Sequence, residues 1–269
     1  MEFDKRRSRF RSLHESGTFV IPNPHDIGSC RLLASLGFPA LATTSGGFAA
    51  SLGRMDMTVS REELIDHVKA LVASTDLPIS VDAEQCFPES PGGVVTTVEL
   101  LAEAGAAGCS IEDWDPAAGR IEDEALAVER VRAASAEADR HGMVLTARAE
   151  NHLRGVDDLD DTVKRLRAYR AAGAHAVYAP GLTDLRSIER IVEETDAPVN
   201  VLLIPGGPSK DELQRIGVRR LSVGSSLARI AYGALVQAAA DLVDSGSLQE
   251  TWPYLDRDRA KAAFTSPKP

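Results

Sequence analysis

Several acidic side chains lie at the ends of short apolar segments, a pattern that can build a metal site. Asp82 and Glu84 close the segment PISVDAE, and residues two apart on a strand point the same way. Glu112 closes the next such segment, GCSIE, and Asp56 lies in a loop before both. Converging carboxylates repel each other unless a cation lies between them or one keeps its proton. Taken singly, each would more often be a helix cap or a surface side chain.

The ligand chemistry of this acidic set favours a hard cation. Oxygen ligands suit Mg²⁺, for which Mn²⁺ could substitute, and Mg²⁺ uses few protein carboxylates because it keeps several waters. None of the six histidines pairs with another at the spacing of zinc ligands. We therefore predict a Mg²⁺ site at this position.

Other polar residues follow the same apolar segments. Arg148 ends MVLTAR, and its planar guanidinium suits a substrate carboxylate, although it could instead be a counter-ion for the acidic set. The stretch TSGG places Ser45, Gly46 and Gly47 where backbone N–H groups can approach an anion, with a plain tight turn as the alternative. His152 is a candidate for substrate contact or proton transfer.

These residues belong to a repeating order of strand, loop and helix. Short apolar segments flanked by Gly or Pro are typical of strands buried on both faces. Eight alternations over about 250 residues favour a parallel (β/α)8 TIM barrel, in which chemistry lies at the carboxyl ends of the strands. Asn200 would matter if it faces the barrel interior. The predicted strands are 18–23, 40–44, 78–83, 108–112, 143–148, 175–179, 198–204 and 219–223.

The helical segments carry recognisable ends. Ser60 with Glu63, and Ser209 with Glu212, predict capping boxes. Apolar residues at a 3.6-residue period predict a long last helix over 227–244, and a helical extension follows from about 245. We predict one domain over residues 1–269.

Composition restricts the class of protein. The chain has 269 residues and a formal net charge of −10, so we expect no nucleic-acid partner. It has no segment of the ~20 apolar residues that a membrane span needs and no secretory signal. Its three cysteines show no paired spacing and predict reduced thiols in a cytoplasmic protein. The basic run over 5–11 is interpreted as a solvated first helix, with an anion-binding arm as the alternative.

At these residues the sequence resembles the isocitrate lyase / phosphoenolpyruvate mutase superfamily. The resemblance implies a TIM barrel, dependence on Mg²⁺, and cleavage or formation of C–C or P–C bonds next to a 2-oxo acid. It also implies oligomers that exchange the last barrel helix, and so a homodimer or homotetramer. It rests on the stretches 21–47, SLGRMD (51–56), VDAE (81–84), SIED (110–113), TARAE (146–150) and 198–235.

Carried over by position, the family's roles fall on the residues already singled out. The resemblance implies that Asp82 binds Mg²⁺ directly, whereas Glu84 and Glu112 hold the metal mainly through its waters. On the substrate side it implies Ser45, Gly46 and Gly47 for the carboxylate and oxyanion, Arg148 for the carboxylate, and Asp56 near a metal-bound water.

The sequence also departs from the family. After the fourth strand it reads EDWDPAAGRIEDEALAVERV, without the Lys-Lys/Arg-Cys-Gly-His loop of the isocitrate lyases or the mutase's Lys and Asn-Ser. These departures argue against isocitrate lyase and phosphonate mutase activity. Cys86 could replace the missing acid, but we interpret it as a packed thiol.

Three functions therefore stay open. The leading hypothesis is a Mg²⁺-dependent lyase that cleaves a C–C bond of a small 2-oxo or 2-hydroxy (di)carboxylate through a metal-stabilised enolate. The second is an oxaloacetate-type decarboxylase or C–C hydrolase. The third is a non-catalytic barrel that binds 2-oxo acids.

Overall fold

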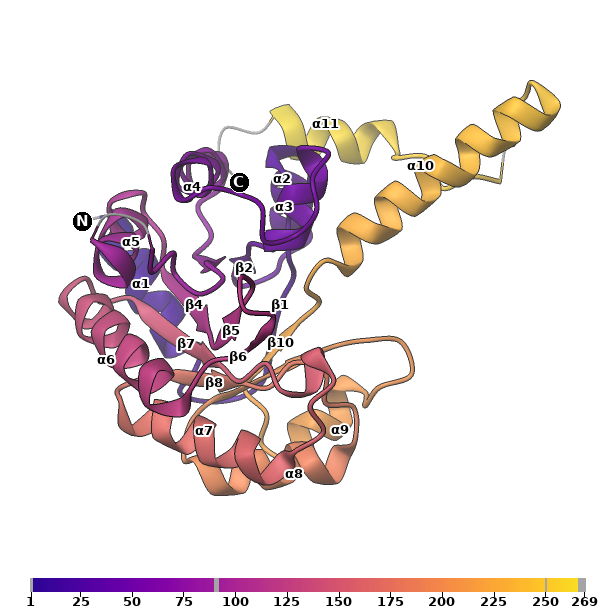
Figure 1. The fold of residues 1–269 in the computed structure, drawn as a ribbon. Helices are drawn as coiled ribbons and strands as arrows, with labels where there is room; N and C mark the ends of the chain where they lie inside the picture. Colours follow the sequence, from indigo (N-terminus) through magenta and orange to yellow (C-terminus); the bar gives the residue numbers. More distant parts are fainter. Residues whose placement is uncertain (1, 90–91, 250, 266–269) are drawn as a thin grey trace.

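The computed structural model describes residues 2–89, 92–249 and 251–265, and its main feature is a ring of eight parallel strands surrounded by helices (Figure 1). Neighbouring strands follow the order β1-β10-β9-β8-β7-β4-β3-β2. Between β2 and β1 the ring closes through a backbone hydrogen bond of 3.1 Å, which the Ala42 N–H donates to the Pro22 carbonyl. The predicted (β/α)8 barrel is confirmed.

Each strand lies within its predicted limits. Their alternating side chains face either the barrel interior or the surrounding helices, which explains why strands such as β4 are buried throughout. The strands of the barrel are β1 (Phe19–Ile21), β2 (Leu41–Ala42), β3 (Ile79–Asp82), β4 (Gly108–Glu112), β7 (Val144–Arg148), β8 (Ala176–Tyr178), β9 (Val199–Leu202) and β10 (Arg220–Ser222).

The helices surround the barrel and begin as expected. Both predicted capping boxes are present, at Ser60 with Glu63 and at Ser209 with Glu212. The helices are α1 (Glu2–Ser12), α2 (Ile27–Ser35), α3 (Ser45–Ser51), α4 (Arg61–Ser74), α5 (Gly93–Glu103), α6 (Glu124–Arg140), the 3₁₀ turn η1 (His152–Arg154), α7 (Leu159–Ala171), α8 (Leu185–Thr195), α9 (Lys210–Arg215), α10 (Ser226–Ser245) and α11 (Arg257–Thr265). In the part of the chain that is described, none is long and apolar enough to span a membrane.

Helix α1 covers the amino-terminal end of the barrel, which forms its floor. Phe10 packs there against Phe19 at the start of β1. Interpreting the basic run as a solvated helix was wrong for Arg6 and Arg7, which are buried. Their guanidinium groups donate hydrogen bonds to backbone carbonyls, including that of Ala106 from Arg7 Nε at 3.1 Å. They satisfy carbonyls that would otherwise lack partners at this end.

The last two helices leave the barrel wall. Helix α10 projects away from the ring, and α11 returns to lie beside α2 (Figure 1). The predicted long helix over 227–244 is confirmed as α10. Large apolar side chains along it are exposed: Ile230, Leu235, Val236, Leu242 and Val243.

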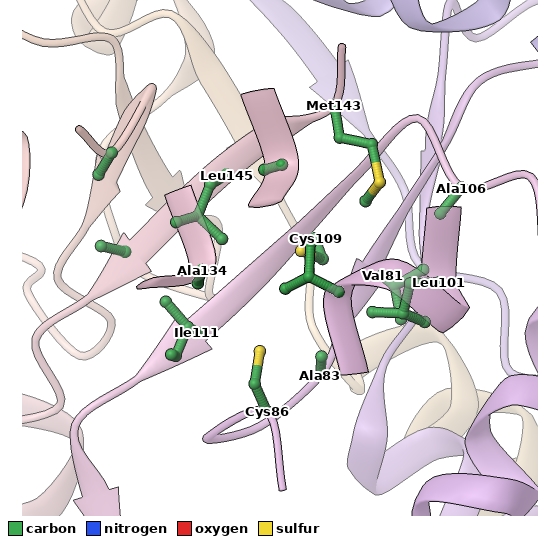
Figure 2. Close-up of a cluster of buried hydrophobic side chains, with 14 of the residues drawn as sticks. Val81, Ala83, Cys86, Leu101, Ala106, Cys109, Ile111, Ala134, Met143 and Leu145 are labelled. Carbon is green, nitrogen blue, oxygen red and sulfur yellow. The ribbon is translucent and has the colours of Figure 1, made fainter. Parts of the chain in front are cut away.

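Between the strands and the outer helices lies the apolar core. Cys109 and Ile111 of β4 and Leu145 of β7 pack against residues of α5 and α6, including Leu101 and Ala134 (Figure 2). Their alternation with the inward-facing side chains fixes which residues face the barrel interior.

Candidate active site

A cavity of about 340 Å³ lies inside the barrel, and side chains near the carboxyl ends of the strands form much of its wall. The predicted site residues divide into two groups around it. Its lining includes Ser45, Asp56, Asp82, Arg148 and Asn200 but not Gly46, Gly47, Glu84, Glu112 or His152.

Asp82 ends β3 with its carboxylate held by three donors. Oδ2 accepts a hydrogen bond from the Ser45 N–H at 3.1 Å. Oδ1 accepts from the Ser110 hydroxyl at 3.4 Å and from Arg148 Nη1 at 2.8 Å. The backbone N–H of Asp82 donates to the Thr43 hydroxyl at 2.9 Å, which ties the end of β3 to β2. Asp82 is therefore fixed in place at the cavity wall.

Arg148 stands among three carboxylates. Its nearest oxygens belong to Asp82 at 2.8 Å, Glu150 at 2.9 Å and Glu112 at 3.0 Å. Arg154 adds a second cation, 3.6 Å from both Glu112 and Glu150. These contacts are those of a counter-ion, while the cavity-lining position keeps Arg148 available to a substrate. The predicted role as a carboxylate clamp stays a prediction.

Burial and mutual repulsion alter the acidic groups. Burial, then the charges of Asp82 and Asp56, raise the pKa of Glu84 to about 8. Burial also raises the pKa of Glu112 well above its ordinary value, although Arg148 opposes the effect. Glu112 Oε1 is buried without a hydrogen-bond partner among the described residues. The hydrogen bonds around these carboxylates thus do not fully stabilise their charged forms.

The acidic set fits Mg²⁺ through water-mediated rather than complete protein ligation. In the described ranges, no group of three or more His, Cys, Asp or Glu side chains is arranged so that it could hold a metal ion by itself. Mg²⁺ usually keeps several waters and binds one or two carboxylates. A cavity-lining Asp82, with Glu84 nearby and with Glu112 Oε1 free of hydrogen bonds in the described chain, suits such an ion. The ligand assignment itself remains a prediction.

The sequence suggested a loop or tight turn at Ser45, Gly46 and Gly47. In the structure these residues form the first turn of α3. Thr44 caps this helix, and its hydroxyl accepts from the Gly47 N–H at 3.4 Å. Both glycines are sites of close approach. A Cβ on Gly46 would lie 3.1 Å from Asp56 Oδ2, and one on Gly47 would lie 2.5 Å from the Thr44 methyl carbon. Larger residues would displace Asp56 or the cap.

His152 begins the 3₁₀ turn η1 after β7. Its side chain is 7% exposed, and Nδ1 lies 3.5 Å from Asp157. Its Nε2 is buried without a hydrogen-bond partner in the described chain, and burial lowers the pKa of the imidazole. The next residue, Leu153, lines the cavity instead. A substrate contact by His152 stays a prediction.

Asn200 faces the barrel interior, where it lines the cavity. This orientation is what a role in the site requires of it. Its side chain donates to the Ser222 hydroxyl at 3.0 Å and accepts from Arg220 Nε at 2.9 Å. Arg220, Tyr178 and Ser222 line the same cavity, and sequence reasoning missed all three. Arg220 and Ser222 lie two residues apart on β10 and so share a face, which was the available signal for this pair.

Cys86 is a packed thiol, as interpreted from the sequence. Its side chain points into the apolar core near Cys109 and Ile111 (Figure 2). Contact with Cys109 and burial raise its pKa well above the ordinary value, so it stays protonated. It does not line the cavity. In place of a long loop, β4 is followed by a two-stranded hairpin, β5 (Trp114–Asp115) and β6 (Arg120–Ile121).

This hairpin is anchored at the site. The guanidinium of Arg154 lies 4.3 Å from the ring centroid of Trp114, a cation–π contact. Arg154 also faces Glu112 and Glu150, so the hairpin is tied to the acidic cluster. The sequence did not predict these two-residue strands.

Comparisons with known proteins agree with this geometry. An oxaloacetate decarboxylase of Bradyrhizobium diazoefficiens is 30% identical over 218 residues, covering 78% of this chain and 74% of the relative. A probable 2-methylisocitrate lyase 2 of Corynebacterium glutamicum is 28% identical over 236 residues, covering 83% and 76%. A crystal structure from Burkholderia cenocepacia J2315, provisionally named a lyase/mutase, is 44% identical with a TM-score of 0.93, covering 99% and 98%. The phosphoenolpyruvate phosphomutase family model matches residues 10–243. The chain therefore belongs to the phosphoenolpyruvate phosphomutase family, within the superfamily that the sequence predicted.

Proposed function

We propose that this protein is a Mg²⁺-dependent lyase that cleaves a C–C bond of a small 2-oxo or 2-hydroxy (di)carboxylate. The observation that carries the proposal is the position of Asp82. Its carboxylate lines the cavity, with Ser45 N–H on one oxygen and Arg148 on the other. Anion donors and the proposed metal ligand thereby share one wall of the cavity.

Each group of residues at the site would have its own role in the proposed reaction. Arg148 and the first turn of α3 would bind the substrate carboxylate, because both present N–H donors to the cavity region. Mg²⁺, when held by Asp82 and through waters by Glu84 and Glu112, would stabilise the enolate oxygen as a Lewis acid. Asp56 would orient a water beside the metal site.

His152 is the candidate side chain for proton transfer. His152 has an unpartnered Nε2 and a lowered pKa, so it would be neutral near pH 7 and able to accept a proton. Cys86 is excluded from this role because it is packed in the apolar core, where its raised pKa keeps the thiol protonated and unable to accept a proton. We propose His152 as the side chain to test.

A turnover assay tests the proposal. The protein would be incubated with 2-oxo and 2-hydroxy dicarboxylates in Mg²⁺ or in EDTA, and release of a 2-oxo acid measured. Mg²⁺-dependent release supports a lyase. Turnover that EDTA does not affect would contradict the metal-dependent mechanism.

A decarboxylase is the second candidate. It is favoured by the short β5–β6 hairpin after β4, a segment that carries no cysteine to act as the acid, and by the relative named oxaloacetate decarboxylase. Conversion of oxaloacetate to equal amounts of CO₂ and pyruvate would select it. Mg²⁺-dependent binding of oxalate without turnover of any compound would select a non-catalytic barrel.

We also propose that the protein is a homo-oligomer. Helix α10 projects from the barrel (Figure 1). Its side chains Leu235, Val236 and Val243 are 63%, 69% and 86% exposed. Exposed apolar surface of this kind marks an interaction site. A second copy of the chain would cover it.

A further inference from the structure

Arg220 is a buried cation without a carboxylate. It is 6% exposed, and among residues 2–89, 92–249 and 251–265 no acidic side chain lies within ion-pair distance of it. Its contacts are neutral: Nε donates to Asn200 Oδ1 at 2.9 Å, and Nη1 lies 3.4 Å from His14 Nε2. A buried charge that lacks a counter-charge is destabilising. A bound anion would offset that cost.

His14 cannot supply the missing charge. Its Nδ1 donates to the Phe10 carbonyl at 2.9 Å, which leaves Nε2 as the acceptor that faces Arg220. Burial, and then the charge of Arg220, lower the pKa of His14 to about 3, so the ring is neutral. Arg220 is therefore positioned by its neighbours but not neutralised by them.

Arg148, the second arginine that lines the cavity, has carboxylates around it, unlike Arg220. Arg148 and Arg220 both line it, and they are linked along the barrel wall by register pairs through Tyr178 and Asn200. Arg148 has three carboxylates within 3.0 Å, whereas Arg220 has none within ion-pair distance in the described chain. Burial, and to a smaller extent the charge of Arg148, lower the pKa of the Arg220 guanidinium to about 10, although Tyr178 opposes the effect. An incoming anion thus finds its uncompensated cation at Arg220.

The surroundings of Arg220 suit a carboxylate. Ser222 and Tyr178 bring hydroxyl groups to the same part of the cavity, and Asn200 holds the Ser222 hydroxyl at 3.0 Å. Arg220 lies near the floor, since His14 and Phe10 belong to the helix that closes the barrel there. The end of the cavity at Asp82 and Ser45 lies at the carboxyl ends of β3 and β2. Because Arg220 and Asp82 line one cavity, a single molecule bound there can face both of them.

We propose that Arg220, with Ser222 and Tyr178, binds a second carboxylate of the substrate, so that the enzyme selects dicarboxylates over monocarboxylates. This inference rests on the proposed function, because it takes the first carboxylate to lie at the Asp82 end. It assigns a specificity role to a residue of β10 whose side chain reaches the cavity from the barrel floor.

Malate and lactate provide a matched pair of probes. Both carry a 2-hydroxy carboxylate, but malate alone has the second carboxylate. Calorimetry in Mg²⁺ would compare the wild-type protein with Arg220→Met, which retains much of the side-chain volume without the charge. We expect wild-type protein to prefer malate, and Arg220→Met to lose about tenfold or more of its malate affinity while lactate affinity changes less than about twofold.

Arg219→Met is the control. It removes the same charge from the preceding residue, whose side chain points away from the interior and donates to the Gly17 carbonyl at the surface. It should leave both affinities unchanged. Arg220→Lys, which keeps the charge, should retain more malate affinity than Arg220→Met and gives a folded comparison if the methionine variant fails to fold.

The outcomes separate this inference from the proposed function. Equal losses for malate and lactate in Arg220→Met, or no wild-type preference for malate, overturn the floor subsite. A malate preference that depends on Arg220 but is the same in Mg²⁺ and in EDTA supports the subsite and contradicts the metal-dependent function.

Discussion

Arg148 Nη1 and Asp82 Oδ1 lie 2.8 Å apart beside the end of β4, and their contact joins the end of β7 to the end of β3. The contact places a fixed positive charge against the proposed metal ligand. It raises the question of whether Arg148 serves the substrate or the acidic cluster, and the two roles predict different losses.

Replacing Arg148 by Lys distinguishes these roles. If Arg148 clamps a substrate carboxylate, an ammonium cannot reproduce its planar fork, and kcat/KM should fall by roughly tenfold or more with Mg²⁺ affinity nearly unchanged. Steady-state kinetics with a Mg²⁺ titration measure both. Near-normal kcat/KM in Arg148→Lys, together with altered Mg²⁺ affinity in Arg148→Ala, would assign Arg148 as a counter-ion.

Isocitrate and 2-methylisocitrate should not be cleaved at an appreciable rate. The segment after β4 carries no cysteine, and its short hairpin is anchored by Trp114 to Arg154. Glyoxylate and pyruvate release are the respective measurements. An ordinary kcat on either compound, on the order of 1 s⁻¹ or more, would show that another residue supplies the acid.

The exposed face of α10 predicts self-association. Light scattering at micromolar concentration should give a mass of at least twice 28.8 kDa. Leu235→Glu should shift the protein toward the monomer, because a charge would be buried in the interface. Gln237→Glu, on the same helix at an already polar position, is the control. A wild-type monomer would rule out helix exchange.

Acid should destabilise the fold partly through His14. Its folded-state pKa, about 3, lies below the unfolded value of 6.5, so the unfolded chain binds the extra proton as the pH falls through that window. Stability is therefore full above pH 6.5 and declines toward pH 3. His14 should contribute a loss of about 2 kcal/mol between pH 6.5 and 5.

Thermal unfolding of His14→Gln tests this contribution. The variant should show a shallower fall in Tm over the same pH range than the wild-type protein. Parallel Tm curves for the two proteins would mean that His14 does not titrate on unfolding as described.

The sequence predicted the barrel because its strands are short apolar runs, and such runs are typical of strands that are buried on both faces. It did not predict the β5–β6 hairpin, whose two-residue strands have no alternation to detect. Nor did it predict that α3 begins at Ser45, since Gly46 and Gly47 are poor helix formers and the Thr44 cap outweighs their propensity.

The sequence predicted only some of the site residues, for a similar reason. Asp82 and Arg148 could be singled out because charged residues are unusual at the ends of buried strands. Arg6 and Arg7 were misjudged because their partners are carbonyls distant in sequence, including those of Val72 and Ala106. Arg220 was overlooked because its proposed role depends on having no carboxylate beside it in the described chain. The sequence alone does not show which side chains lie beside it.

The binding of oxalate to Asp82→Ala tests the central claim most directly. Calorimetry should show that wild-type protein binds oxalate with Mg²⁺ and not with EDTA. Asp82→Ala should weaken that binding by more than roughly 100-fold, since changes to outer-shell partners alone cost 10–100-fold. Glu99→Ala, an exposed carboxylate on α5, should bind as the wild-type protein does. Oxalate affinity that neither Asp82→Ala nor EDTA alters, in a protein that remains folded, would contradict the metal site.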